Sequence, residues 1–169
     1  MAEVFLSLGS NTQRYRHMTI ALDSLNKQFG SLTLSRVYES ESVGFPGSLF
    51  LNMAVGFFTD MPLNDLAAQM WAIEFSNGRQ VGAAKFSPRT LDIDILSYDD
   101  ACGCHAGIEL PRAEILYNAF VLLPLSEVAP DHCHPVDGRN YRTLWRGYQS
   151  DQKLWPVPFQ WQGRDISAG

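Results

Sequence analysis

"RTLDIDILSYDD", residues 89–100, alternates apolar and acidic side chains in the way that is typical of a β-strand. Successive side chains of a strand point to opposite faces of its sheet, so the leucine and isoleucines at the start of this stretch share one face. Asp92 and Asp94 then share the other face. We expect the apolar face to lie on the hydrophobic core and the two carboxylates to face polar groups.

The order of the elements around this stretch indicates the fold class. Helical spacing predicts helices within residues 17–30 and 61–78. Apolar or alternating runs predict four strands, at residues 3–9, 32–40, 49–59 and 89–98. The order β-α-β-β-α-β is that of a ferredoxin-like α+β fold, in which an antiparallel sheet carries its helices on one face. The other face is then expected to be free for a site.

The last third of the chain has a weaker pattern. From residue 110 we expect short helical turns broken by Pro111, Pro124 and Pro130, followed by an aromatic, proline-rich tail. Large aromatic side chains are a liability in a loose tail, so we expect this one to pack back onto the domain or onto a partner subunit. The prediction is one domain, residues 1–169, with a C-terminal extension.

Composition restricts the partners. The chain has 169 residues, 46% of them hydrophobic, and a net charge of −5 with no block of lysine and arginine, which disfavours a general nucleic-acid surface. It has no apolar run of membrane-spanning length, and its N-terminus does not resemble a secretory signal. Three cysteines, an odd number, fit a reducing compartment. We therefore expect a cytoplasmic protein with a small ligand, and the oligomeric state is not determined.

The paired aspartates predict a metal-assisted reaction. Carboxylates at positions i and i+2 of one strand offer the hard oxygen ligands that suit magnesium, often shared with substrate phosphates. Arg89 could hold a phosphate beside them, together with Arg79, Lys85 and Arg112. An equally simple interpretation is that the aspartates line the solvated face of an amphipathic strand, and the spacing alone does not decide between the two. Closely spaced Cys and His at 102–105 and 132–134 are a weaker pattern for zinc.

Several motifs together resemble one enzyme family. FLSLGSN, FLNMAV, NGR, SPRTLDIDIL and NAFVLLPLSEVAP occur in the order found in 6-hydroxymethyl-7,8-dihydropterin pyrophosphokinases. The resemblance implies the ferredoxin-like fold and transfer of pyrophosphate from ATP to the pterin hydroxymethyl group in folate biosynthesis, assisted by two magnesium ions. It also implies that Asp92 and Asp94 are the magnesium ligands and that Arg89 belongs to the catalytic site. Glu74 matches a glutamate near the family's active site.

The same resemblance implies a pterin slot. Phe50 and Phe120 would stack on the two faces of the pterin, and Asn52 would hydrogen-bond its edge. The backbone around Ser42 and Val43 would close the slot. A flat heterocycle gains from stacking on both faces, and an amide can both donate and accept, so the residue types suit this ligand. Without the motifs, the two phenylalanines would be interpreted as core residues.

The chain departs from the family mainly on the nucleotide side. Val81 and Asn118 stand where the family has arginines, and Ala113 stands where it has tyrosine. Arg112 replaces a histidine and could bind phosphate in its place, because a guanidinium pairs well with phosphate oxygens. The loop before the signature also differs, with phenylalanine and serine at 86–87. The alternative to an enzyme is therefore a divergent, non-catalytic pterin-binding or interaction paralogue on the same fold.

Overall fold

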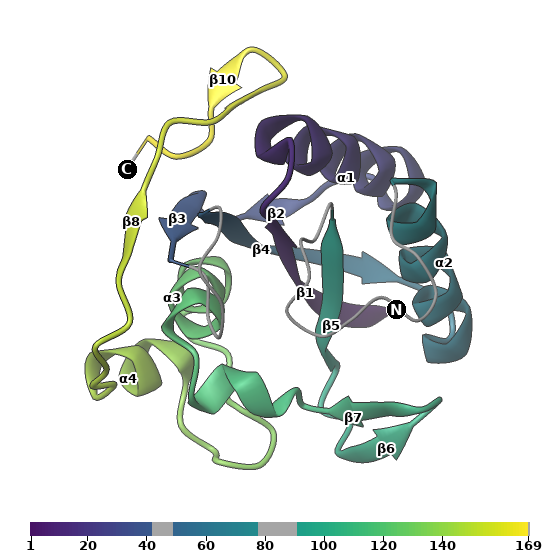
Figure 1. The fold of residues 1–169 in the computed structure, drawn as a ribbon. Coiled ribbons are helices and arrows are strands. Elements are labelled where there is room, and N and C mark those ends of the chain that lie inside the picture. Colours follow the sequence, from purple (N-terminus) through teal and green to yellow (C-terminus); the bar gives the residue numbers. More distant parts are fainter. Residues whose placement is uncertain (42–48, 78–90, 169) are drawn as a thin grey trace.

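The computed structural model describes residues 1–41, 49–77 and 91–168. The described strands form one main sheet in the order β5-β1-β4-β3-β8, with β2 also paired to β4, and every described pairing is antiparallel (Figure 1). Two small hairpins, β6-β7 and β9-β10, lie outside it. In chain order the elements are β1 (Ala2–Ser10), α1 (Arg14–Phe29), β2 (Thr33–Leu34), β3 (Tyr38–Ser40), β4 (Phe50–Thr59), α2 (Leu63–Ser76), β5 (Asp92–Tyr98), β6 (Gly103–His105), β7 (Ile108–Leu110), the 3-10 helix η1 (Ala113–Leu116), α3 (Ala119–Val128), α4 (Tyr141–Arg146), β8 (Leu154–Pro156), β9 (Gln160–Trp161) and β10 (Arg164–Asp165).

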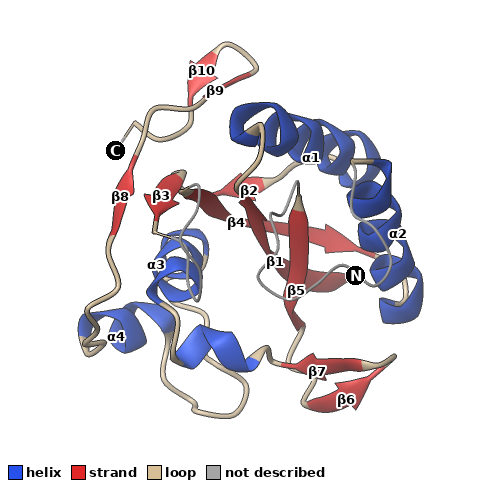
Figure 2. Ribbon diagram, in the orientation of Figure 1, coloured by secondary structure: helices blue, strands red, loops and turns tan. Residues whose placement is uncertain are grey.

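This order confirms the ferredoxin-like α+β prediction. Helices α1 and α2 lie together on one face of the sheet (Figure 2). Their apolar residues recur at helical spacing and meet every second residue of the long strands, which is what binary patterning requires of a shared core. The buried side chains of this first core include Leu6 and Leu8 of β1, Met53 and Val55 of β4, Ile93 and Ile95 of β5, Met18, Leu22 and Leu25 of α1, and Leu66 and Met70 of α2.

The opposite face is free only in part. Helices α3 and α4 pack over one end of it and form a second core with Phe5, Ala54 and Leu96 of the sheet. Gly56 permits the close approach of α3 to the sheet, since a Cβ there would lie 3.1 Å from Val128 Cγ1 of α3 and 2.9 Å from the Phe5 ring. The expectation of an open second face is therefore wrong for this end, because the segment after residue 110 supplies helices whose apolar faces the pattern did not reveal.

The strand predicted at residues 32–40 is interrupted. The amide of Arg36 donates to Glu127 of α3 (3.0 Å), and the amide of Val37 donates to Ser167 (2.8 Å). These side-chain acceptors take the place of the neighbouring strand, so the run divides into β2 and β3. Burial, together with the Glu127 carboxylate, raises the pKa of the Tyr38 hydroxyl, which therefore stays protonated and donates to Glu127. The interruption thereby fastens α3 to β3.

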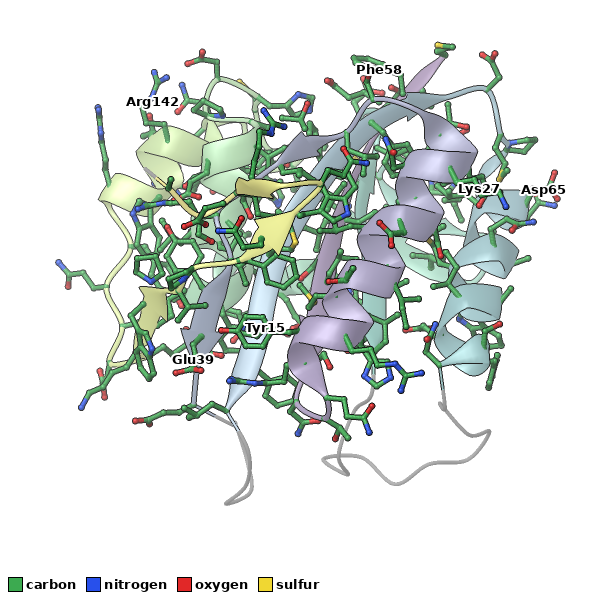
Figure 3. The ribbon with its side chains drawn as sticks, turned by 90° about the horizontal axis from the view of Figure 1, so that it is seen from above. Tyr15, Lys27, Glu39, Phe58, Asp65 and Arg142 are labelled. Atoms are coloured by element: carbon green, nitrogen blue, oxygen red, sulfur yellow. The ribbon has the colours of Figure 1, made fainter. Side chains whose placement is uncertain are left out.

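The C-terminal segment packs back onto the domain, which is one of the two arrangements that the sequence predicts for it. Strand β8 pairs with β3 and extends the sheet. Phe159 is buried and stacks on Tyr15 of α1, which is labelled in Figure 3, at 5.5 Å between ring centroids. The Trp161 indole donates to Asp23 (2.9 Å). None of the helices in the described ranges is long and apolar enough to cross a membrane.

Candidate active site

Strand pairing places the polar residues of three strands side by side. Gly9 of β1 pairs with Asn52 of β4 on one side and with Asp92 of β5 on the other. Paired residues of neighbouring strands project from the same face, so Asn52 and Asp92 face the same space across a glycine that has no side chain. One row further along, Ser7 lies beside Asp94. These residues, Ser7, Asn52, Asp92 and Asp94, lie at the end of the second face that α3 and α4 do not cover. We call them the polar rows.

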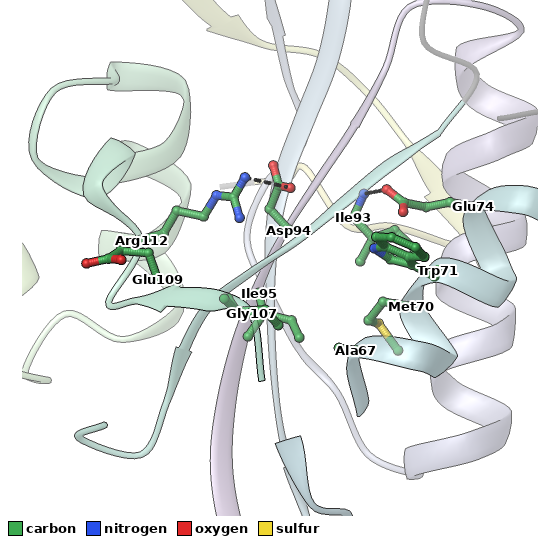
Figure 4. A pocket seen from close by; sticks show the side chains of 11 residues that line it. Ala67, Met70, Trp71, Glu74, Ile93, Asp94, Ile95, Gly107, Glu109 and Arg112 are labelled. Atoms are coloured by element: carbon green, nitrogen blue, oxygen red, sulfur yellow. Dashed lines mark hydrogen bonds and ion pairs between the residues drawn. The ribbon is translucent and has the colours of Figure 1, made fainter. Parts of the chain in front are cut away.

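Arg112 lies beside the second aspartate. Its Nη2 is 3.3 Å from Asp94 Oδ1 and its Nε is 3.6 Å from Glu114 Oε1, with both carboxylates only partly exposed (Figure 4). The Arg112 amide donates to the Leu96 carbonyl (2.9 Å), which fixes its backbone against β5. A guanidinium between two carboxylates offsets part of their negative charge and offers donors to an arriving anion. Asp94 therefore faces a cation, as the sequence pattern indicated that it should face polar groups.

Glu74 contacts the backbone between the two aspartates. Its carboxyl, on α2, is only 3% exposed, and Oε2 accepts a hydrogen bond from the Ile93 amide (2.8 Å). Strand β5 is an edge strand, so this amide has no strand neighbour on its outer side. Glu74 thus holds the strand at the point from which Asp92 and Asp94 project.

A cavity of about 270 Å³ opens next to this point (Figure 4). It is bounded by α2, β5, β7 and Arg112, and its lining is about equally polar and apolar. The lining side chains comprise Ala67, Met70, Trp71, Glu74, Ile93, Asp94, Ile95, Ile108, Glu109 and Arg112. Asp94 and Arg112 thus line the same cavity with opposite charges.

Sequence reasoning missed Trp71. The apolar stripe of α2 packs into the first core through Leu66 and Met70. Trp71 lies off that stripe, is 64% exposed, and meets Phe75 edge to face at 5.9 Å between ring centroids. A large aromatic residue outside the core stripe of an amphipathic helix was the signal available in the sequence.

The residues expected for a pterin slot lie on β4 and α3. Asn52 is 6% exposed, and its Nδ2 donates to Ser40 Oγ of β3 (2.7 Å), a partner that sequence reasoning also missed. Phe50 is half-buried and pairs with Ser40 across the same two strands. Phe120, the second residue of α3, is half-buried against the second core. Neither phenylalanine is a fully buried core residue.

Part of the expected site lies outside the described residues. This applies to Ser42, Val43, Arg79, Lys85 and Arg89, and to the substituted positions Val81, Phe86 and Ser87. The other substituted positions are described. Ala113 begins η1, and Asn118 bonds to Glu114 and to Gln152 of the C-terminal segment.

The Cys and His residues do not assemble a zinc site within the described parts of the chain. There, no group of three or more His, Cys, Asp and Glu side chains has an arrangement that could hold a metal. His134 Nδ1 accepts from the amides of Val136 (3.1 Å) and Asp137 (2.9 Å), so this ring serves a turn. The zinc interpretation of 102–105 and 132–134 is therefore wrong.

Comparison with known proteins gives consistent matches. The sequence profile of the family 7,8-dihydro-6-hydroxymethylpterin-pyrophosphokinase matches residues 5–130. A 2-amino-4-hydroxy-6-hydroxymethyldihydropteridine pyrophosphokinase of Porphyromonas gingivalis is 38% identical over 136 residues, covering 77% of this chain and 92% of the relative. A protein of the same name from Aquifex aeolicus is 30% identical over 158 residues, covering 92% of this chain and 96% of that one.

Solved structures agree on the fold. The crystal structure of Plasmodium falciparum HPPK-DHPS with pteroate matches 87% of this chain with a TM-score of 0.66 and 15% sequence identity. The match covers 42% of the Plasmodium chain, so the present chain spans less than half the length of that protein. At this identity the likeness shows the fold alone.

Proposed function

The chain belongs to the 7,8-dihydro-6-hydroxymethylpterin-pyrophosphokinase family, and on this premise we propose that Asp92 and Asp94 are the metal ligands of its reaction. The activity is that of an ATP-dependent diphosphotransferase of folate biosynthesis, acting on the hydroxymethyl group of 6-hydroxymethyl-7,8-dihydropterin. The observation that carries the assignment is the position of the two carboxylates. They share one face of edge strand β5, and Asp94 lines a cavity that ends on Arg112.

The donor set fits two magnesium ions. Asp92 and Asp94 supply hard oxygen ligands and are only partly buried, which leaves room for the waters that magnesium retains. When bound, the ions would neutralise charge on the triphosphate and on the leaving group. The protein holds the two carboxylates in place. The hydrogen bond that the Ile93 amide donates to Glu74 contributes to this at the outer edge of β5.

The cavity suits the nucleotide. The Trp71 indole and the apolar part of the lining would pack against a purine ring, while Glu109 offers an acceptor. Arg112 lies where the lining changes from apolar to charged, between Glu114 and Asp94. There it would bind phosphate oxygens and stabilise charge that shifts onto the leaving group. Arg79, Lys85 and Arg89 are proposed to contribute further cations from outside the described residues.

The pterin would bind on the polar rows. Ser40 holds the Asn52 amide, which leaves Asn52 Oδ1 to accept a hydrogen bond from the pterin edge. Phe50 and Phe120 would stack on its two faces, with Ser42 and Val43 closing the slot. The hydroxymethyl group would then point along the row toward Asp92. We also propose that residues 1–169 form one domain, because the C-terminal segment extends the same sheet.

The test is to measure binding and transfer separately. Calorimetry with the hydroxymethyl pterin, and with a magnesium-bound non-hydrolysable ATP analogue, measures each affinity. Formation of AMP from ATP in the presence of the pterin measures transfer of pyrophosphate. We expect both ligands to bind and AMP to form only with magnesium and pterin present. Pterin binding without AMP formation at any magnesium concentration would instead support the non-catalytic paralogue.

A further inference from the structure

Gln152 joins the C-terminal segment to the start of α3. The residue lies beyond position 130, where the match to the family ends. Its Oε1 accepts from the Ala119 amide (2.7 Å) and from the Tyr148 hydroxyl (3.0 Å), and its Nε2 donates to Asn118 Oδ1 (2.9 Å). The oxygen and the nitrogen of this half-buried side-chain amide thus both form hydrogen bonds at the start of α3.

The first of these bonds caps α3. The initial amides of a helix have no partner within it, and a side-chain acceptor that satisfies one of them stabilises the helix start. The usual capping position is Asn118, but among the described residues its side chain bonds elsewhere and does not cap. Gln152 provides the acceptor from a distant part of the chain. Phe120, the next residue of the helix, depends on this helix start for its position.

The second bond leads to the polar rows. Gln152 Nε2 occupies Asn118 Oδ1, so Asn118 Nδ2 is directed to Glu114 Oε2 (2.8 Å). Glu114 Oε1 in turn lies 3.6 Å from Arg112 Nε, and Arg112 Nη2 lies 3.3 Å from Asp94 Oδ1. An unbroken series of polar contacts therefore runs from the C-terminal segment to the aspartate.

We propose that Gln152 is a positioning residue for pyrophosphate transfer. It fixes the connection between η1 and α3. The distance between Phe120, on the pterin side, and Arg112, on the nucleotide side, is thereby kept constant. The proposal rests on the proposed function of this site. It also explains what the asparagine at 118 does where the family has an arginine: it transmits the orientation set by Gln152 instead of meeting a phosphate.

Two substitutions separate the two bonds. Gln152→Glu keeps an acceptor for the Ala119 amide but places a carboxylate against Asn118 Oδ1. Asn118 must then rotate its amide, and its oxygen would face Glu114, which breaks the contacts toward Arg112. Gln152→Ala removes both bonds. Tyr148→Phe is the matched control, because it removes a partner of Gln152 and leaves both bonds to α3 in place.

The measurements are pterin and nucleotide affinity by calorimetry, with kcat and KM from AMP formation, at a temperature where each variant is folded. We expect Gln152→Ala to weaken pterin affinity about fivefold, the effect of losing an average helix cap. We expect Gln152→Glu to keep near wild-type pterin affinity and to lower kcat about fivefold, the effect of losing an average hydrogen bond. Tyr148→Phe should resemble the wild type in both.

The result that overturns the proposal is a lowered melting temperature with unchanged affinities and kcat, because a merely structural residue would behave in that way. Should Gln152→Ala fail to fold, Gln152→Glu, which retains the cap, decides by its kcat. An inactive wild type would instead reject the proposed function, so the two failures are distinguishable.

Discussion

The two faces of the sheet are built from alternate residues of the same strands, yet they differ in kind. On the face under α1 and α2, Leu6, Leu8 and Met53 are fully buried in the first core. On the other face the apolar surface stops after Phe5, and Ser7 and Gly9 follow. Neighbouring residues of one strand therefore lie on different faces, one in the core and the next in the candidate site, because the side-chain period of a strand is two. Stability and activity should therefore respond to different residues of the same strand.

The largest effect is expected at the aspartates. Asp92→Ala or Asp94→Ala should lower kcat about 1,000-fold or more, a loss of at least about 4 kcal/mol in transition-state stabilisation, since the metal loses a ligand. The free energy of unfolding should change by less than about 1 kcal/mol, because the ion pair of Asp94 with Arg112 is partly exposed and repulsion between the carboxylates is relieved.

AMP formation and urea denaturation check this prediction. The exposed Asp60→Ala serves as the control for loss of a carboxylate. Near wild-type turnover in either variant at ordinary magnesium concentration would show that the metal assignment is wrong.

Leu8→Ala tests the opposite face of the same strand. Leu8 lies between Ser7 and Gly9 in sequence and is fully buried in the first core. The substitution should lower the free energy of unfolding by about 3 kcal/mol through lost burial and an unfilled cavity. The kcat of the folded fraction should stay near wild type. A large fall in kcat without loss of stability would contradict the assignment of stability to one face and activity to the other.

Arg112→Ala tests the nucleotide end of the polar rows. Removing charge-assisted bonds to phosphate should lower kcat by an amount equivalent to about 2 kcal/mol and raise the KM for ATP by less, because the charge develops mainly in the transition state. Steady-state kinetics give both constants. Arg142→Ala, which removes an arginine of α4 (labelled in Figure 3) paired with exposed Asp131, is the control. Equal kcat and equal KM for ATP in the two variants would show that Arg112 is a surface residue without a role in transfer.

Restoring the family's residues sharpens the same point. Ala113→Tyr together with Asn118→Arg should raise nucleotide affinity if the space beside Arg112 still admits a ring and a second guanidinium. In this chain Asn118 also bonds to Gln152, so the double change should at the same time lower the melting temperature. Calorimetry and thermal denaturation separate the two effects, and no gain in affinity would argue that this end has lost its ancestral geometry.

Phe120→Ala should weaken pterin binding while leaving nucleotide binding unchanged, because it removes one face of the stack. The loss is expected to be about 1 kcal/mol beyond that from the lost apolar area. Calorimetry with each ligand alone measures it. Equal weakening of both affinities would assign Phe120 to the second core.

The smallest effect concerns pH and the second core. Burial lowers the pKa of His134, whose Nδ1 accepts two amide hydrogen bonds and whose ring meets Tyr141. Because the folded pKa is below the unfolded one, the unfolded chain takes up the proton first, and stability falls as pH drops from 7 to 5. Asp137, whose pKa Arg139 lowers to about 2, stays ionised in this range. The melting temperature should fall less in His134→Gln, and an equal fall would exclude His134 as the cause.

Local pattern alone determined much of this protein. The order of strands and helices, and the parity that sets Asp92 and Asp94 apart from Ile93, could be predicted from the sequence, because side-chain periodicity repeats over a few residues. The resemblance to one family came separately, from short motifs and their order along the chain. Only the tertiary structure decided that α3 and α4 cover one end of the second face, that Ser40 orients Asn52, that Trp71 lines a cavity and that Gln152 caps α3. Each of these depends on which distant side chain meets a backbone or a ring, and that is set by strand pairing and packing across the whole chain, for which no short stretch of sequence carries a signal.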